Sequence, residues 1–175
     1  MKTLDSKILF KNPWWEYKLD MYELSNGVHS EYHYVSTYGS TFVVPRLKNG
    51  NFLLIQQERY LNKKLSLEFP GGGQKKELSK LDNIRNELTE ETGLIGNKFI
   101  ELGVFNPYIG VTNEPCSIFY CDDFEFGSAN LEETEIIKTI ELSENEIDNA
   151  IKKQEMWSGI SIVAWTFYKL NKEKL

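Results

Sequence analysis

The sequence of 175 residues is poor in cysteine and has neither a long apolar run nor an excess of basic charge. Two cysteines are too few for a disulfide scaffold or a four-thiolate zinc site, so we expect reduced thiols. No run approaches the roughly 18 apolar residues of a transmembrane helix, and the N-terminal stretch lacks the apolar segment of a signal peptide. A formal net charge of −6 argues against binding nucleic acid by phosphate neutralisation. Together these features predict a cytoplasmic protein that binds neither membranes nor nucleic acid.

The residues that are present suit one globular domain with a small N-terminal extension. We place the extension at residues 1–38 and the main domain at residues 39–175. Asn26-Gly27 stands between two aromatic-rich runs, which predicts a β-hairpin in the extension. Packing in a core is the favoured interpretation of Trp14 and Trp15; an oligomer interface and stacking on a base are the alternatives.

In the main domain, strands are predicted before and after a single helix, and two further helices follow. A second Asn-Gly at 49–50 predicts another hairpin, and Ser143 with Glu146 forms a capping box at a helix start. Cys116 and Cys121 are an odd number of residues apart in one predicted strand, which places them on opposite faces. This order predicts an α+β fold with helices packed on a mixed sheet. The expected strands are 41–47, 52–58, 66–70, 98–106, 116–126 and 136–142, and the expected helices are 79–92, one after Ser143 and one from about Ser158.

The helix predicted at 79–92 carries Glu87, Glu90 and Glu91 on one face, because they stand at i, i+3 and i+4. Like charges at this spacing repel one another, and a bound divalent cation would offset the repulsion. Carboxylate oxygens favour Mg²⁺, Mn²⁺ or Ca²⁺ over zinc. A solvated acidic face is the alternative interpretation. The apolar stripe predicted to pack this helix consists of Leu81, Ile84 and Leu88.

Three glycines, Gly71–Gly73, precede that helix and leave the backbone bare, so that its amides and carbonyls can approach a ligand or metal. A plain turn is the alternative. Arg59 has a planar guanidinium suited to phosphate, and a surface salt bridge is its alternative role. Several basic residues near this stretch could hold a small anion or line a solvated loop: Lys63, Lys64, Lys75, Lys76, Lys80 and Arg85.

The stretch from Gly72 to Leu94 resembles the Nudix hydrolase signature, G-x5-E-x7-R-E-U-x-E-E-x-G-U, where U is a bulky apolar residue. The spacing is intact, but Leu78 replaces the isolated glutamate and Asn86 replaces the arginine. Other segments look like the ADP-ribose pyrophosphatase branch of that family, namely NPWW-EY, GSTFVVP, Gln57-x-Arg59-Tyr60 and SLEFPGGG.

The resemblance implies an α/β/α sandwich and Mg²⁺-dependent hydrolysis of a nucleoside diphosphate-sugar, with Mn²⁺ as a second suitable ion. The products would be a nucleoside monophosphate and a sugar phosphate, and a homodimer is expected. The metal ligands that the resemblance implies are the Gly71 carbonyl, Glu87, Glu91 and Glu90, with Glu90 alternatively orienting water. The implied substrate-binding residues are Arg59, Gly72 and Gly73. A loop glutamate, Glu133 or, second, Glu135, would activate water.

The two departures from the signature leave the ligand set complete. Asn86 can hydrogen-bond but has neither the charge nor the reach of arginine, and Arg85 lies about 100° around the helix. We therefore expect hydrolysis, at a reduced rate. The alternative is a sensor that binds a nucleotide-sugar with little turnover.

Overall fold

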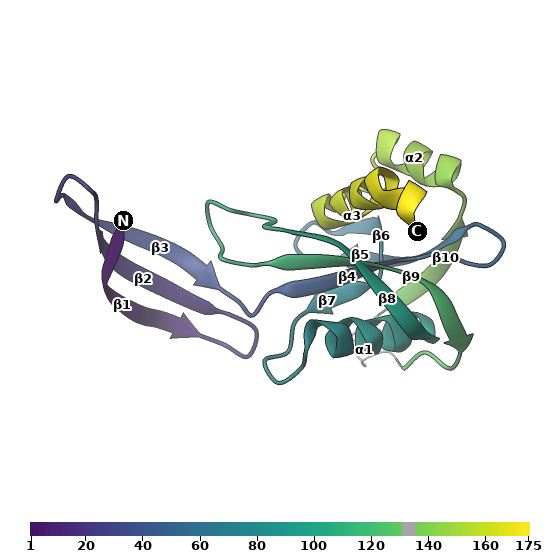
Figure 1. The fold of residues 1–175 in the computed structure, drawn as a ribbon, viewed down its shortest axis with the longest axis horizontal. Coiled ribbons are helices and arrows are strands. Elements are labelled where there is room, and N and C mark those ends of the chain that lie inside the picture. Colours follow the sequence, from purple (N-terminus) through teal and green to yellow (C-terminus); the bar gives the residue numbers. More distant parts are fainter. Residues whose placement is uncertain (131–135) are drawn as a thin grey trace.

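The computed structural model describes residues 1–130 and 136–175, whose strands form three sheets (Figure 1). β4 and β9 pair in parallel, and the other pairings are antiparallel, so the central sheet is mixed. The sheets have the strand orders β1-β2-β3, β10-β5-β6 and β7-β4-β9-β8. The strands are β1 (Lys2–Lys11), β2 (Glu16–Glu23), β3 (His29–Ser36), β4 (Ser40–Pro45), β5 (Phe52–Arg59), β6 (Lys64–Glu68), β7 (Gly71–Gly73), β8 (Leu94–Phe105), β9 (Cys116–Phe126) and β10 (Ile137–Leu142).

Helices cover both sides of the central strands, which gives the predicted α/β/α layers. α1 (Lys80–Thr92) lies on one side, and α2 (Glu144–Lys152) and α3 (Gly159–Asn171) lie on the other (Figure 1). Each side has its own apolar cluster, and Cys116 belongs to one while Cys121 belongs to the other. The prediction that the two cysteines face opposite sides is therefore confirmed, and both thiols are reduced.

Helix α1 begins and ends where its capping residues predict. The Ser79 hydroxyl accepts a hydrogen bond from the Asp82 amide at 3.1 Å, and Gly93 ends the helix in the left-handed conformation. Ile84 and Leu88 are fully buried. Leu81 was predicted to join them but is exposed, because the side of α1 that faces β4 and β7 is occupied by polar Asn83 instead.

The glycine segment is a short strand, so the alternative of a plain turn is wrong. β7 pairs with β4, and Gly71 lies opposite Phe42. Gly71 has a φ of 147°, and a side chain there would collide with the Thr41 carbonyl oxygen. Glycine is therefore required where the chain passes between β4 and α1.

The two C-terminal helices start as predicted, and α3 adds two aromatic rings to the core. The capping box of Ser143 and Glu146 is present, and Ser158 caps α3. The apolar residues of α3 that recur at three- and four-residue steps are Ile160, Val163, Ala164, Phe167 and Leu170. Ala164 is buried, and Ile160 and Phe167 are partly buried against the core. The rings of Trp165 and Tyr168 are buried as well; they stack on each other and pack edge-on against Phe52.

The N-terminal extension is a three-stranded sheet that projects from the rest of the molecule (Figure 1). The Asn26-Gly27 turn joins β2 and β3 as predicted, but β1 was not predicted. No residue in 1–38 is fully buried, so the favoured expectation that Trp14 and Trp15 pack in a core is wrong. Trp14 is 76% exposed. Within the described part of the chain, every helix is too short or too polar to cross a bilayer.

Candidate functional site

The glutamates of α1 meet the glycine strand. The Glu91 carboxylate accepts a hydrogen bond from the Gly71 amide at 2.9 Å, and Glu91 is buried. Glu87 lies against Gly72, where an added β-carbon would stand 2.7 Å from Glu87 Oε2. Two carboxylates one helical turn apart are thus held against bare backbone, as the sequence pattern predicts.

Asn83 belongs to the same row of α1, one turn before Glu87, and sequence reasoning missed it. It is buried; its side-chain oxygen accepts from the Lys75 amide at 3.0 Å, and its Nδ2 donates to Thr41 Oγ1 at 2.9 Å. Asn83 therefore ties α1 to β4 and to the segment that follows β7. The signal was available in the sequence, because positions 83, 87 and 91 are four residues apart.

A cavity of about 670 Å³ opens beside Glu87, Glu91 and the glycine strand Gly71–Gly73. Carboxylates from α1 line one part of it, and lysines from the loop after β7 line another. Aromatic residues of the N-terminal extension also reach it, so the exposed tryptophans face the candidate site. Its lining includes Trp14, Arg59, Gly71, Gly72, Gly73, Lys75, Lys76, Glu87, Glu90, Glu91 and Glu114.

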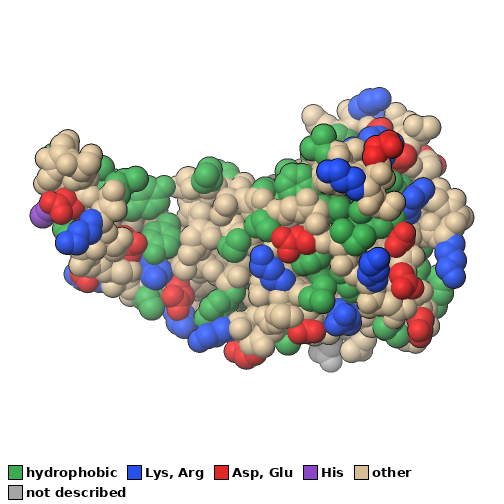
Figure 2. Space-filling model, viewed as in Figure 1, with side chains coloured by type: hydrophobic (Ala, Val, Ile, Leu, Met, Phe, Trp, Pro, Cys, Tyr) green, Lys and Arg blue, Asp and Glu red, His purple; other side chains and the backbone are tan. Residues whose placement is uncertain are grey.

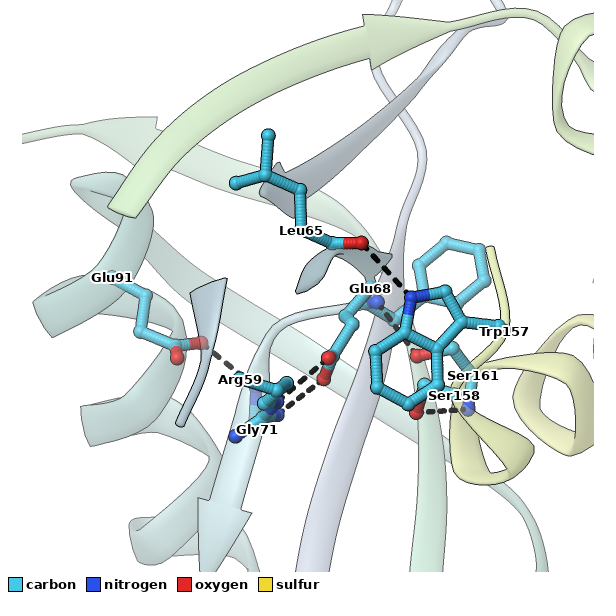
Figure 3. A network of polar contacts seen from close by, with 9 residues as sticks. Arg59, Leu65, Glu68, Gly71, Glu91, Trp157, Ser158 and Ser161 are labelled. Atoms are coloured by element: carbon cyan, nitrogen blue, oxygen red, sulfur yellow. Dashed lines mark hydrogen bonds and ion pairs between the residues drawn. The ribbon is translucent and has the colours of Figure 1, made fainter. Parts of the chain in front are cut away.

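Arg59 lies at the end of β5 and forms a two-pronged ion pair with Glu68 (Figure 3). Its Nε donates to Glu68 Oε1 at 2.7 Å, and its Nη2 donates to Glu68 Oε2. Glu68 is only 1% exposed, whereas Arg59 lines the cavity. Arg59 therefore forms an ion pair with a buried glutamate that sequence reasoning missed, in place of the surface salt bridge that was its alternative role. The fork of Glu68 fixes the plane of the guanidinium at the cavity wall.

The donor set fits a hard divalent cation such as Mg²⁺. Mg²⁺ typically takes one or two protein carboxylates and completes its shell with water and phosphate oxygens. Glu87 and Glu91 supply two carboxylates beside the backbone of Gly71. Among residues 1–130 and 136–175, no three acidic, histidine or cysteine side chains are grouped closely enough to hold an ion by themselves. An ion held here would complete its shell with further oxygens, as Mg²⁺ typically does.

The departures at positions 85 and 86 have visible consequences. Arg85 donates to the Gly96 carbonyl oxygen and lies 5.7 Å from the Phe99 ring, so it joins α1 to β8 and does not replace the missing arginine. Asn86 is exposed. The glycine strand holds the glutamates in place through the hydrogen bond from the Gly71 amide to the Glu91 carboxylate.

The predicted loop base falls outside the described residues, since Glu133 and Glu135 both lie in 131–135. The described chain before that gap does approach the site. The Asn130 amide donates to the Glu90 carbonyl oxygen at 3.0 Å, near the C-terminal end of α1.

The α/β/α layers, with a glutamate-bearing helix against a glycine strand, define a Nudix-type fold. A solved structure described as an ADP compounds hydrolase matches with a TM-score of 0.85, covering 99% of this chain and 96% of the other. At 17% sequence identity this likeness establishes the fold alone. The methanol dehydrogenase activator of Bacillus methanolicus is 24% identical over 171 residues, which cover 97% of this chain and 92% of the activator. No protein-family profile matches the sequence.

Proposed function

We propose that this chain is a metal-dependent hydrolase of nucleoside diphosphate-sugars of the ADP-ribose type, releasing a nucleoside monophosphate and a sugar phosphate. The observation that carries the proposal is the placement of Glu87 and Glu91 against Gly72 and Gly71, at the floor of a cavity. Repelling carboxylates are costly to hold together unless a cation binds between or beside them. The fold of an ADP compounds hydrolase agrees with this chemistry.

The pyrophosphate is a poor electrophile because its own negative charge repels a nucleophile. A bound divalent ion would offset that charge and lower the pKa of a coordinated water. Glu87 and Glu91 would hold the ion together with the Gly71 carbonyl, and Glu90 would complete the set or orient the water. Deprotonation of the water is assigned to Glu133, with Glu135 as the second choice.

The rest of the cavity suits the substrate. Arg59, with its plane fixed by Glu68, offers a rigid cation to a phosphate. Lys75 and Lys76 add mobile positive charge at the same cavity, and Gly72 and Gly73 allow a close approach. Exposed Trp14 at the rim supports the stacking alternative over core packing.

The test is incubation with Mg²⁺ and a panel of nucleoside diphosphate-sugars, with detection of the monophosphate. Turnover of at least one member is expected. Glu91→Gln should lower kcat/KM by about 100-fold or more, because loss of a charged metal ligand costs more activity than loss of a residue that only orients a ligand. The same variant should retain its fold, since glutamine can still accept from the Gly71 amide. Unchanged turnover in Glu91→Gln would show that the metal assignment is wrong.

A second candidate function is an activator or sensor that binds a nucleotide-sugar with little turnover. It is supported by the likeness to the methanol dehydrogenase activator along nearly the whole chain. The absence of an arginine at position 86 agrees with slow chemistry. Tight binding across the panel without product, together with faster turnover of an alcohol dehydrogenase in its presence, would favour this function.

A further inference from the structure

A second hollow of about 610 Å³ adjoins the cavity described above. Arg59, the glycine strand Gly71–Gly73 and Glu114 line both spaces. A ligand with a phosphate at the glycine strand can therefore extend in two directions. The first cavity is lined by the glutamates of α1 and by Trp14. The second hollow is therefore available for the group at the other end of a pyrophosphate.

The walls of the second hollow suit a neutral group. Among the described residues that line it, Arg59 is the only cation, and its charge is matched by Glu68. Glu114 adds a further carboxylate, so the groups that line this hollow carry no excess of positive charge. The lysines of the first cavity do not reach it. Its remaining walls combine aromatic rings with hydroxyl and amide groups, from Phe42, Tyr60, Asn62, Trp157 and Ser158.

Trp157 is fixed in place before any ligand arrives. Its indole Nε1 donates to the Leu65 carbonyl oxygen at 2.9 Å, and Lys64 Nζ lies 5.4 Å from the ring centre. Figure 3 shows it beside the Arg59–Glu68 pair. A fixed aromatic ring costs little ordering entropy on binding and can cover the apolar C–H face of a sugar.

Glu114 is also oriented, because the Ser40 hydroxyl donates to its Oε1 at 2.5 Å. A carboxylate has several acceptor sites, so Glu114 can still accept from a ligand hydroxyl. An aromatic face with a nearby carboxylate and an amide is a set of groups that recognises a ring with several hydroxyls.

We propose that the second hollow is the subsite for the sugar of a nucleoside diphosphate-sugar, with Trp157 under the ring and Glu114 and Asn62 on its hydroxyls. The proposal deepens the proposed function and rests on it, since it assumes that the pyrophosphate lies at the glycine strand.

The test compares two ligands, of which one ends in the sugar and the other in a free phosphate. They are the α,β-methylene analogues of ADP and of ADP-ribose, which keep both phosphates and resist hydrolysis at the bridge. Calorimetry with Mg²⁺ should show tighter binding of the ADP-ribose analogue to the unmodified protein. Trp157→Ala should lower the affinity for the ADP-ribose analogue by about 10-fold and leave the affinity for the ADP analogue unchanged. This is the effect expected for loss of one aromatic contact.

Three variants complete the design. Trp157→Phe keeps the ring and should retain most of the sugar preference. Asn62→Ala lies in an exposed turn, so it tests the subsite without threatening the fold. Phe126→Ala removes an aromatic side chain that is 81% exposed and outside both spaces, and should change neither affinity.

Equal weakening of both ligands by Trp157→Ala, or no effect of either Trp157→Ala or Asn62→Ala, would overturn the subsite. Failure of the proposed function is a separate result. It would appear as absence of hydrolysis of natural nucleotide-sugars, while the binding difference between the two analogues persists.

Discussion

At the scale of single residues, Gly72 is the position where an added carbon is informative. The β-carbon of Gly72→Ala would stand 2.7 Å from Glu87 Oε2 and would push that carboxylate away. The end of a glutamate side chain moves easily, so we expect little change in melting temperature. A displacement of about 1 Å in a catalytic group typically costs about 100-fold in rate, so kcat should fall by roughly that factor.

Gly110→Ala is the control, because nothing lies within 4 Å of its added β-carbon and Gly110 does not line the cavity. It should keep near-normal kcat and stability. Equal kcat for the two alanine variants, measured with excess Mg²⁺, would contradict the role assigned to Glu87.

The two buried thiols make the free energy of unfolding depend on pH in the alkaline range. Burial raises the pKa of Cys116 and of Cys121 from 9.0 to about 11. The folded state therefore holds these protons more tightly than the unfolded state does. Their contribution to stability is complete below pH 9 and is lost as the pH rises toward 11.

Urea unfolding between pH 8 and pH 11 measures this loss, and the free energy of unfolding should fall over the upper part of that range. Replacing both cysteines by alanine should flatten the slope while lowering stability below pH 9, since two sulfur atoms are removed from the core. An equal slope in the two proteins would show that the thiols are not its source.

At the scale of elements, α1 is held to the strands by a buried polar contact. Asn83→Ala would leave Thr41 Oγ1 and the Lys75 amide without the partner that the asparagine provides. Loss of such buried hydrogen bonds typically costs about 1–3 kcal/mol in the free energy of unfolding. The site should also loosen, because Asn83 stands one turn before Glu87.

Asn86→Ala is the control for that experiment, since the same chemical change is made three residues later on an exposed part of α1. Chemical denaturation of both variants should show a clear loss for Asn83→Ala and almost none for Asn86→Ala. Alanine has a higher helix propensity than asparagine, so propensity alone would favour both variants. A loss of the same size in both would show that the contacts of Asn83 are not its source.

The elements that sequence predicted well are those whose signals are local. Ser79, Gly93 and the capping box of Ser143 act within a few residues, so the helix boundaries could be read directly. β1 was missed because its stability comes from pairing with β2, and its own residues are all exposed.

Parts of the candidate site were equally beyond local signals. The glutamate face of α1 follows from spacing alone. The pairing of Arg59 with buried Glu68 depends on the register of β5 against β6, in which Arg59 lies opposite Lys64 and Ile55 opposite Glu68. The burial of Trp165 and Tyr168 in α3 was likewise not apparent from spacing, because it depends on how their rings fit against Phe52 of β5.

At the scale of the whole molecule, the projecting N-terminal sheet exposes apolar side chains that no other part of the described chain covers. A three-stranded sheet is stable when an apolar face is covered, yet no residue of 1–38 is fully buried. Hydrophobic side chains are visible on its surface (Figure 2), and Ile8 and Phe10 are each 55% exposed. Exposed apolar area of this kind marks an interaction site. We propose that the occupant is a second copy of this chain, giving the homodimer that the family resemblance implies.

Sedimentation velocity at micromolar concentration should therefore show a dimer. Ile8→Lys places a charge on the sheet and should shift the protein toward the monomer, whereas Lys7→Ala at the neighbouring exposed position should leave the dimer intact. Circular dichroism would establish that Ile8→Lys retains its strands. A monomeric unmodified protein, or a folded Ile8→Lys variant that remains fully dimeric, would contradict this assignment. Because Trp14 follows β1 and lines the cavity, dissociation should also raise KM for the nucleotide substrate while leaving kcat near its original value.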